Sequence, residues 1–107
     1  MGKMNNDGSG AVAAEKWFRA LGDGHRLRIL DLLAETEMNA GELLEQVDVV
    51  QSTLSHHMKI LCDSGLVICR KDGKWTNYSI SPEGVESFKE MISYYTKYDN
   101  GKKCPNS

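Results

Sequence analysis

A single stretch, residues 51–65, carries the side chains best suited to bind a nucleic acid. At about 100° per residue on a helix, Leu54, Met58 and Leu61 share one narrow apolar face. The polar arc away from that face carries an amide, two hydroxyls, an imidazole and an amine, which belong to Gln51, Ser52, Ser55, His56 and Lys59. Such groups hydrogen-bond base edges and phosphates in a major groove. The pattern predicts a helix that reads DNA, although any surface helix can show similar polar residues.

A shorter helix and a turn come before this stretch. Asn39 and Glu42 have the spacing of a capping box, and an apolar face of about two turns follows them. About three residues then separate this helix from Gln51. Two short helices joined in this way form a helix-turn-helix, with the polar arc on the second helix.

An earlier helix is expected to support this motif. Asp23 is a suitable N-cap, and the leucines at 27, 30 and 33, with Ile29, are expected to face the core. Arg26 and Arg28 fall on the flanks of this helix. We expect both arginines at the surface or in ion pairs rather than on DNA.

A basic hairpin is predicted after the polar helix. Residues 66–71 are rich in β-branched side chains, Asp72-Gly73 is a strong hairpin signal, and residues 74–80 return as a second strand. Arg70, Lys71 and Lys74 lie near the tip. The hairpin is therefore predicted to be the two-stranded wing of a winged helix, touching phosphates or a minor groove, unless its charges serve only solubility.

The two terminal helices carry more apolar surface than a small body can cover. Trp17 and Phe18 widen the stripe of a helix that begins near Ala11, and Ser81-Pro82 starts a last helix. Apolar residues of this last helix step by three and four at 85, 88, 92 and 95, the spacing of paired helices. We expect a homodimer joined through both terminal helices, the alternative being that they dock on their own subunit.

Length and charge favour one small domain with a local basic surface. The 107 residues carry a net charge of −2. Four basic and two acidic side chains give residues 51–80 a charge of +2, which leaves −4 for the rest. We expect polar, flexible tails at 1–10 and 99–107 around a domain at 11–98. No membrane span or secretion signal is recognisable, so a cytoplasmic location is expected.

Three segments together resemble the ArsR/SmtB family of bacterial winged-helix repressors: LGDGHRLRILDLLAE, QSTLSHHMKIL and SGLVICRKDGKWTNYSI. The resemblance covers roughly residues 11–95. It implies a mostly α fold with four helices, a two-stranded wing and a fifth helix. It also implies a homodimer that binds double-stranded DNA at an imperfect inverted repeat and releases it when an effector binds.

Mapped residue by residue, the family's DNA-binding surface corresponds to the polar arc and the wing tip: Gln51, Ser52, Ser55, His56, Lys59, Arg70, Lys71 and Lys74. His57 lies nearer the apolar side and is expected to be packed. Val50 stands where the family usually has a Ser or Thr cap. Either the helix starts uncapped, or Asp48 supplies the acceptor.

The residues by which relatives bind metal effectors are missing from this sequence. Relatives that sense soft metals use a Cys-Val-Cys segment at positions that here are Asn39, Ala40 and Gly41, and the last helix has no histidine for a zinc or nickel site. We therefore expect no metal site at either of these places, and no cofactor. We expect the three cysteines, Cys62, Cys69 and Cys104, to be reduced thiols. They are either ordinary packing residues, a redox switch or a soft-metal site.

An enzyme is not expected, because no nucleophile–base–orienter set or phosphate loop has useful spacing. The prediction is a sequence-specific DNA-binding transcriptional regulator that acts as a repressor. The alternative is a winged helix that binds only protein.

Overall fold

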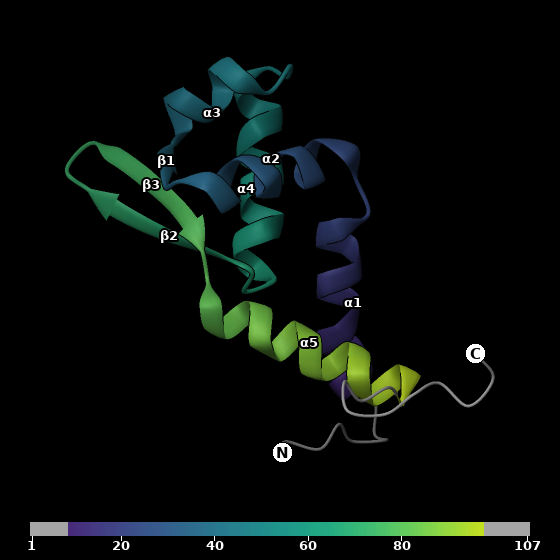
Figure 1. Ribbon diagram of the computed structural model, residues 1–107. Coiled ribbons are helices and arrows are strands. Elements are labelled where there is room, and N and C mark those ends of the chain that lie inside the picture. The colour runs from purple at the N-terminus through teal and green to yellow at the C-terminus, as the bar shows by residue number, and fades with distance from the viewer. Residues whose placement is uncertain (1–8, 98–107) are drawn as a thin grey trace.

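The computed structural model describes residues 9–97, with residues 9–13 described by their backbone alone (Figure 1). The predicted tails fall mostly outside this range, although the first helix already begins at Ser9. The elements in chain order are α1 (Ser9–Leu21), α2 (Gly24–Glu35), β1 (Met38–Asn39), α3 (Ala40–Gln46), α4 (Gln51–Asp63), β2 (Val67–Asp72), β3 (Trp75–Ile80) and α5 (Pro82–Thr96). Among the described residues, no helix combines the length and apolar character needed to cross a bilayer.

The two-stranded wing is confirmed as β2 and β3, and a short third strand that the sequence did not predict joins it, in the order β1-β3-β2. Met38 pairs with Tyr78 and Asn39 with Asn77, both antiparallel. β1 has only two residues, too few to show the alternation by which a strand is recognised in a sequence. It joins the base of the wing to the start of α3.

The helix starts follow from local capping. Asp23 accepts from the backbone N–H groups of His25 and Arg26 at the start of α2. Asn39 and Glu42 form the reciprocal capping box of α3, and Ser81 accepts from the Gly84 N–H ahead of α5. All three caps confirm the sequence predictions, because each depends only on residues two or three apart.

The core lies between α2, α3, α4 and the inner face of the sheet. Its fully buried members include Ile29, Leu43 and Leu61. One predicted core residue is wrong, since Leu27 is half exposed. The inward position on this part of α2 belongs instead to Arg26, which is buried with 8% of its surface exposed, so the expected surface location of this arginine is also wrong.

The terminal helices cross at the end of the molecule away from the wing (Figure 1). Trp17 of α1 meets Phe88 of α5 edge to face, with ring centroids 6.1 Å apart, and Met91 is fully buried. Each helix therefore docks one side on its own subunit. Phe18 and Tyr95 remain 51% and 47% exposed.

Candidate nucleic-acid interface

The predicted recognition surface is the outer face of α4. Its apolar residues Leu54, Met58 and Leu61 are all buried, which confirms the predicted inner face. The polar residues predicted for the other face are all exposed: Gln51, Ser52, Ser55, His56 and Lys59. Lys59 pairs with Asp63 one turn further on, at 3.2 Å. An exposed pair of this kind is worth little to stability, so the ammonium group can exchange its partner for a phosphate.

The start of α4 has no side-chain cap among the described residues. Val50 occupies the N-cap position, so of the two alternatives only the uncapped start agrees with the structure, and Asp48 does not supply the acceptor. The first N–H groups of the helix point along its axis without a side-chain acceptor. A helix end of this kind favours an anion such as a phosphate.

The wing is a hairpin with a two-residue turn. Asp72 pairs with Trp75, so Gly73 and Lys74 form the turn, one residue later than the predicted Asp72-Gly73 turn. Gly73 has a φ of +65° that favours glycine. This turn places Lys74 at the tip, near the exposed Lys71. Arg70 lies further back and pairs with Glu37 at 2.7 Å, beside β1. The sequence did not indicate this ion pair, which holds the predicted phosphate ligand Arg70 against the body.

A buried arginine links α1, α2 and α4 behind the recognition surface. The Nε and NH2 groups of Arg26 donate to the carbonyls of Ala20 and Arg19, at 3.0 and 2.8 Å, and its NH1 lies 2.9 Å from Nδ1 of His57. Because a guanidinium only donates, Nδ1 of His57 accepts and its ring is neutral. Burial, assisted by the Arg26 charge and opposed by Asp23, lowers the pKa of His57. The prediction that His57 is packed is confirmed.

The sequence model of a family described as "Bacterial regulatory protein, arsR family" matches residues 23–68, from the α2 cap into β2. The arsenical resistance operon repressor of Staphylococcus xylosus is 40% identical over 88 residues, which cover 82% of this chain and 85% of that protein. The chain belongs to the arsR family of bacterial regulatory proteins. A second arsR-family relative, the arsenical resistance operon repressor of Staphylococcus aureus, is 49% identical with the same coverage.

A solved structure shares the fold of this chain. The structure of NolR from Sinorhizobium fredii is 31% identical, superposes with a TM-score of 0.66, and the match covers 89% of this chain and 96% of that one. Membership and fold together make this chain a DNA-binding transcriptional repressor, with the winged helix-turn-helix predicted from its sequence.

Residues 39–41, where the resemblance implies thiolates in metal-sensing relatives, form the start of α3 here. Asn39 caps α3, and Ala40 and Gly41 are its first residues. The two described cysteines lie elsewhere, Cys62 half buried in the last turn of α4 and Cys69 exposed on β2. Burial, together with the neighbouring Cys69, raises the pKa of Cys62 to about 11. Cys104 lies outside the described residues.

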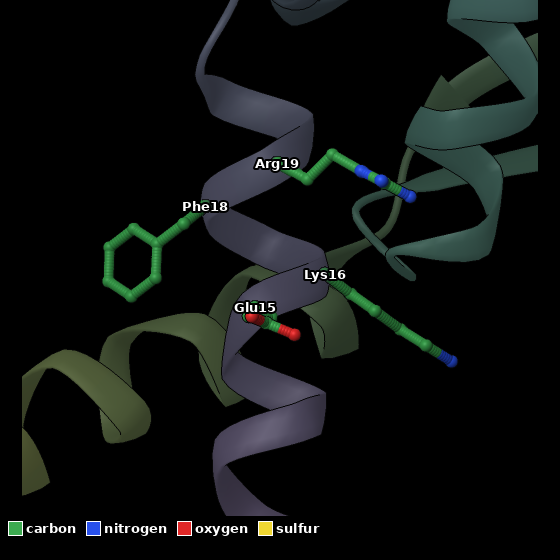
Figure 2. Close-up of a pocket in the computed structure, with 4 residues that line it drawn as sticks. All are labelled: Glu15, Lys16, Phe18 and Arg19. Carbon is green, nitrogen blue, oxygen red and sulfur yellow. The ribbon is translucent and has the colours of Figure 1, made fainter.

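One hollow lies on the surface of α1, lined by Glu15, Lys16, Phe18 and Arg19. Phe18 projects on the opposite side of the helix from Lys16 and Arg19 (Figure 2). These side chains diverge rather than converge on a ligand. The hollow is therefore part of the open outer face of α1.

Proposed function

We propose that this arsR-family protein is a cytoplasmic homodimeric repressor that binds an imperfect inverted repeat in double-stranded DNA. In this proposal each α4 enters a major groove, where Gln51, Ser52, Ser55 and His56 meet base edges and Lys59 meets a phosphate. Lys71 and Lys74 of the wing reach the neighbouring backbone or minor groove, and Arg70 joins them when it leaves Glu37. An effector lowers the affinity and releases the operator.

One observation carries the proposal: α4 buries its whole apolar face and exposes its whole polar arc. A helix held so firmly from behind presents base-reading groups at a fixed orientation. The uncapped start of α4 and the basic wing tip add two phosphate-binding features on either side.

The dimer is supported by apolar surface that one subunit leaves uncovered. Phe18 on α1 and Tyr95 on α5 stay half exposed, although the helices that carry them are in contact through Trp17 and Phe88. A second copy that packs on these helices would cover both residues. It would also set two α4 helices at the spacing that an inverted repeat requires.

The effector is proposed only as a chemical class. The relatives described above are named as arsenical resistance repressors, but the α3 start of this chain has no thiolate. Cys62 and Cys69, with Cys104, are the candidates for sensing a soft metal or an oxidant. If replacing all three with serine leaves induction in cells unchanged, these thiols are bystanders.

The DNA-binding proposal is tested with two matched lysines. Lys59 and Lys89 are 76% and 66% exposed, and each pairs with an acidic residue on its own helix, at 3.2 and 3.4 Å. We expect Lys59→Ala to weaken binding to a duplex selected from a random library, and to reduce the slope of log affinity against log salt by about 0.9 per lost phosphate contact. Lys89→Ala on α5 should change neither quantity.

Recognition of the DNA sequence is tested separately from phosphate binding. Ser55→Ala combined with His56→Ala should reduce the preference for the selected operator over random duplex by about 1–3 kcal/mol per lost base contact. Salt-insensitive binding, or no binding to any duplex in the library, would instead support the protein-only alternative.

The proposed dimer is tested with a second pair of matched residues. Phe18 and Leu27 are about equally exposed, but only Phe18 lies on a terminal helix. In sedimentation equilibrium, Phe18→Glu should shift the protein toward monomer and Leu27→Glu should not. If the unaltered protein is a monomer at all concentrations, the homodimer is refuted.

A further inference from the structure

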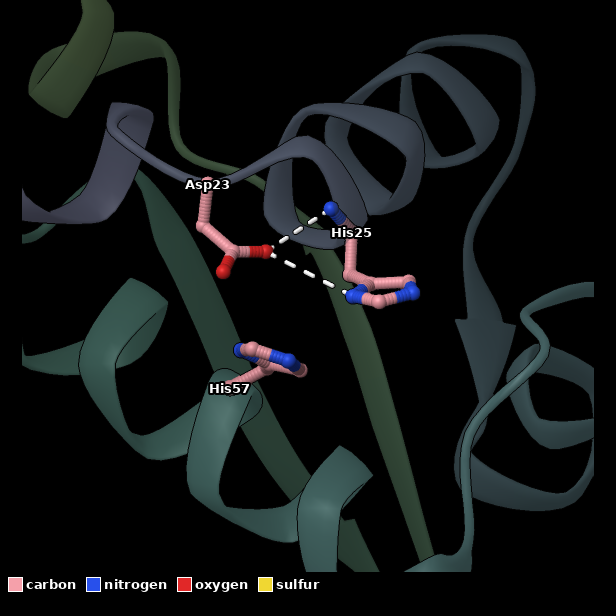
Figure 3. Close-up of side chains that lie close together, drawn as sticks. All are labelled: Asp23, His25 and His57. Carbon is pink, nitrogen blue, oxygen red and sulfur yellow. Dashed lines mark hydrogen bonds and ion pairs between the residues drawn. The ribbon is translucent and has the colours of Figure 1, made fainter.

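Three potential metal ligands converge behind the recognition helix. Asp23 and His25 lie at the start of α2, and His57 lies on the inner side of α4. Each offers one ligand atom, and these atoms all lie within 4.8 Å of one another. Figure 3 shows the three side chains pointing into a common space between the two helices. The sequence predicts no such cluster, because 32 residues separate His25 from His57.

We propose that Asp23, His25 and His57 bind a divalent transition-metal ion of the zinc type. Two imidazole nitrogens and a carboxylate oxygen are ligands that zinc accepts, with bonds of about 2.0–2.2 Å. Tetrahedral geometry at that radius places ligand atoms about 3.3–3.6 Å apart. Asp23 Oδ1 and His25 Nδ1 are already 3.7 Å apart, so side-chain rotations are enough to close the set. Water would complete the coordination.

The carboxylate can serve the metal without giving up the helix cap. Oδ1 of Asp23 accepts from the N–H groups of His25 and Arg26. A carboxylate offers about four lone-pair sites. The lone pairs that these two donors leave unused therefore remain available to the ion.

Arg26 competes with the metal for His57. Its NH1 group donates to Nδ1, and a metal on either ring nitrogen breaks that bond. On Nδ1 the ion takes the place of the N–H donor. On Nε2 the ring proton must move to Nδ1, where it faces the guanidinium. Arg26 keeps its bonds to the carbonyls of Arg19 and Ala20, so it has partners after it yields His57.

Metal binding thus exchanges one link for another. Without metal, α4 is tied through His57 to Arg26 and the end of α1. With metal, it is tied directly to the first turn of α2. Because His57 directly follows His56 of the recognition surface, the ion sits one residue behind a proposed base contact. The site itself does not depend on DNA binding, and its test uses no DNA.

The three histidines of the chain make the test specific, since His56 is exposed and outside the cluster. The full chain with its cysteines replaced by serine, to exclude thiol binding, is titrated with zinc while the imidazole signals are followed by NMR. We expect His25 and His57 to shift together and saturate at one ion per chain, with His56 changing much less. Equal shifts of all three, or none at His25 and His57, would overturn the proposal.

Two variants complete the experiment. His25 is exposed, so His25→Ala should leave the fold intact and weaken zinc binding in calorimetry by at least about tenfold. Asp23→Asn keeps a capping oxygen and should weaken binding similarly. His56→Ala is the matched control and should bind as the unaltered protein does. If His25→Ala binds equally tightly, the ion is held elsewhere.

Discussion

Replacing Arg26 should destabilise the fold more than replacing Arg28, the other arginine of α2. Arg26→Met keeps most of the aliphatic stem but removes three hydrogen bonds, to Arg19, Ala20 and His57. Leaving a buried polar group without its partner costs about 1–3 kcal/mol, and the Arg19 carbonyl is only partly buried. We expect a loss of about 3–5 kcal/mol from the free energy of unfolding, a large share of the roughly 5–15 kcal/mol of a typical domain.

Arg28→Met is the matched control. Arg28 lies two positions further along the same helix, half exposed, with only a 3.9 Å contact to Asp31. Such a pair contributes about 0–1 kcal/mol. In urea unfolding followed by circular dichroism, an m-value of about 2 kcal/mol/M places the Arg26→Met midpoint about 1.5–2.5 M lower, with Arg28→Met close to the unaltered protein. All samples need the same protein concentration, because the stability of the proposed dimer would depend on it.

The reasoning about Arg26 would be refuted by either of two results. One is a loss below about 1 kcal/mol, which no buried three-way hydrogen-bonding role could explain. The other is a loss equal to that of Arg28→Met. The m-values must also agree, so that the midpoints report stability rather than a changed unfolded state.

Three further predictions follow from single contacts. Burial lowers the pKa of His57 in the folded state, so the unfolded chain binds the proton more readily. Stability should therefore be full above about pH 6.5 and should fall as the pH drops from there to the lowered pKa. Urea midpoints should show this trend, and His57→Gln should flatten it. A Cβ on Gly84 would overlap the backbone of the turn before β2, so Gly84→Ala should lower the free energy of unfolding by about 2 kcal/mol or more. A Cβ on Gly24 would meet nothing within 4 Å, so Gly24→Ala in thermal melts should be neutral or stabilising by up to about 1 kcal/mol. With its pKa raised to about 11, Cys62 should react with iodoacetamide at neutral pH more slowly than the exposed Cys69, as peptide mass spectrometry would show; equal rates would contradict its burial.

The features predicted correctly from the sequence are those whose cause is local. The caps at Asp23, Asn39 and Ser81 depend on a side chain and an N–H two or three residues away. The inner face of α4 follows from the helical period, because Leu54 and Met58 lie one turn apart. The wing follows from a glycine that accepts a positive φ between two β-rich runs.

The features that the sequence did not reveal are contacts between distant residues. β1 exists only because β3 offers it a free edge, and Arg70 meets Glu37 only across that sheet. Arg26 was expected at the surface because the neighbouring sequence shows no side chain that would pair with a buried guanidinium group. Its partner His57 is 31 residues away.

The sequence by itself thus determined the caps of α2, α3 and α5, which face of α4 is buried and that a hairpin with Gly73 in its turn follows α4, since propensity, capping and periodicity act within one or two turns. Only the tertiary structure decided which side chains stand behind the recognition helix. The packing of α2 against α4 brings Asp23, His25 and Arg26 to His57, and a buried polar group takes whichever partner the fold places within hydrogen-bonding distance.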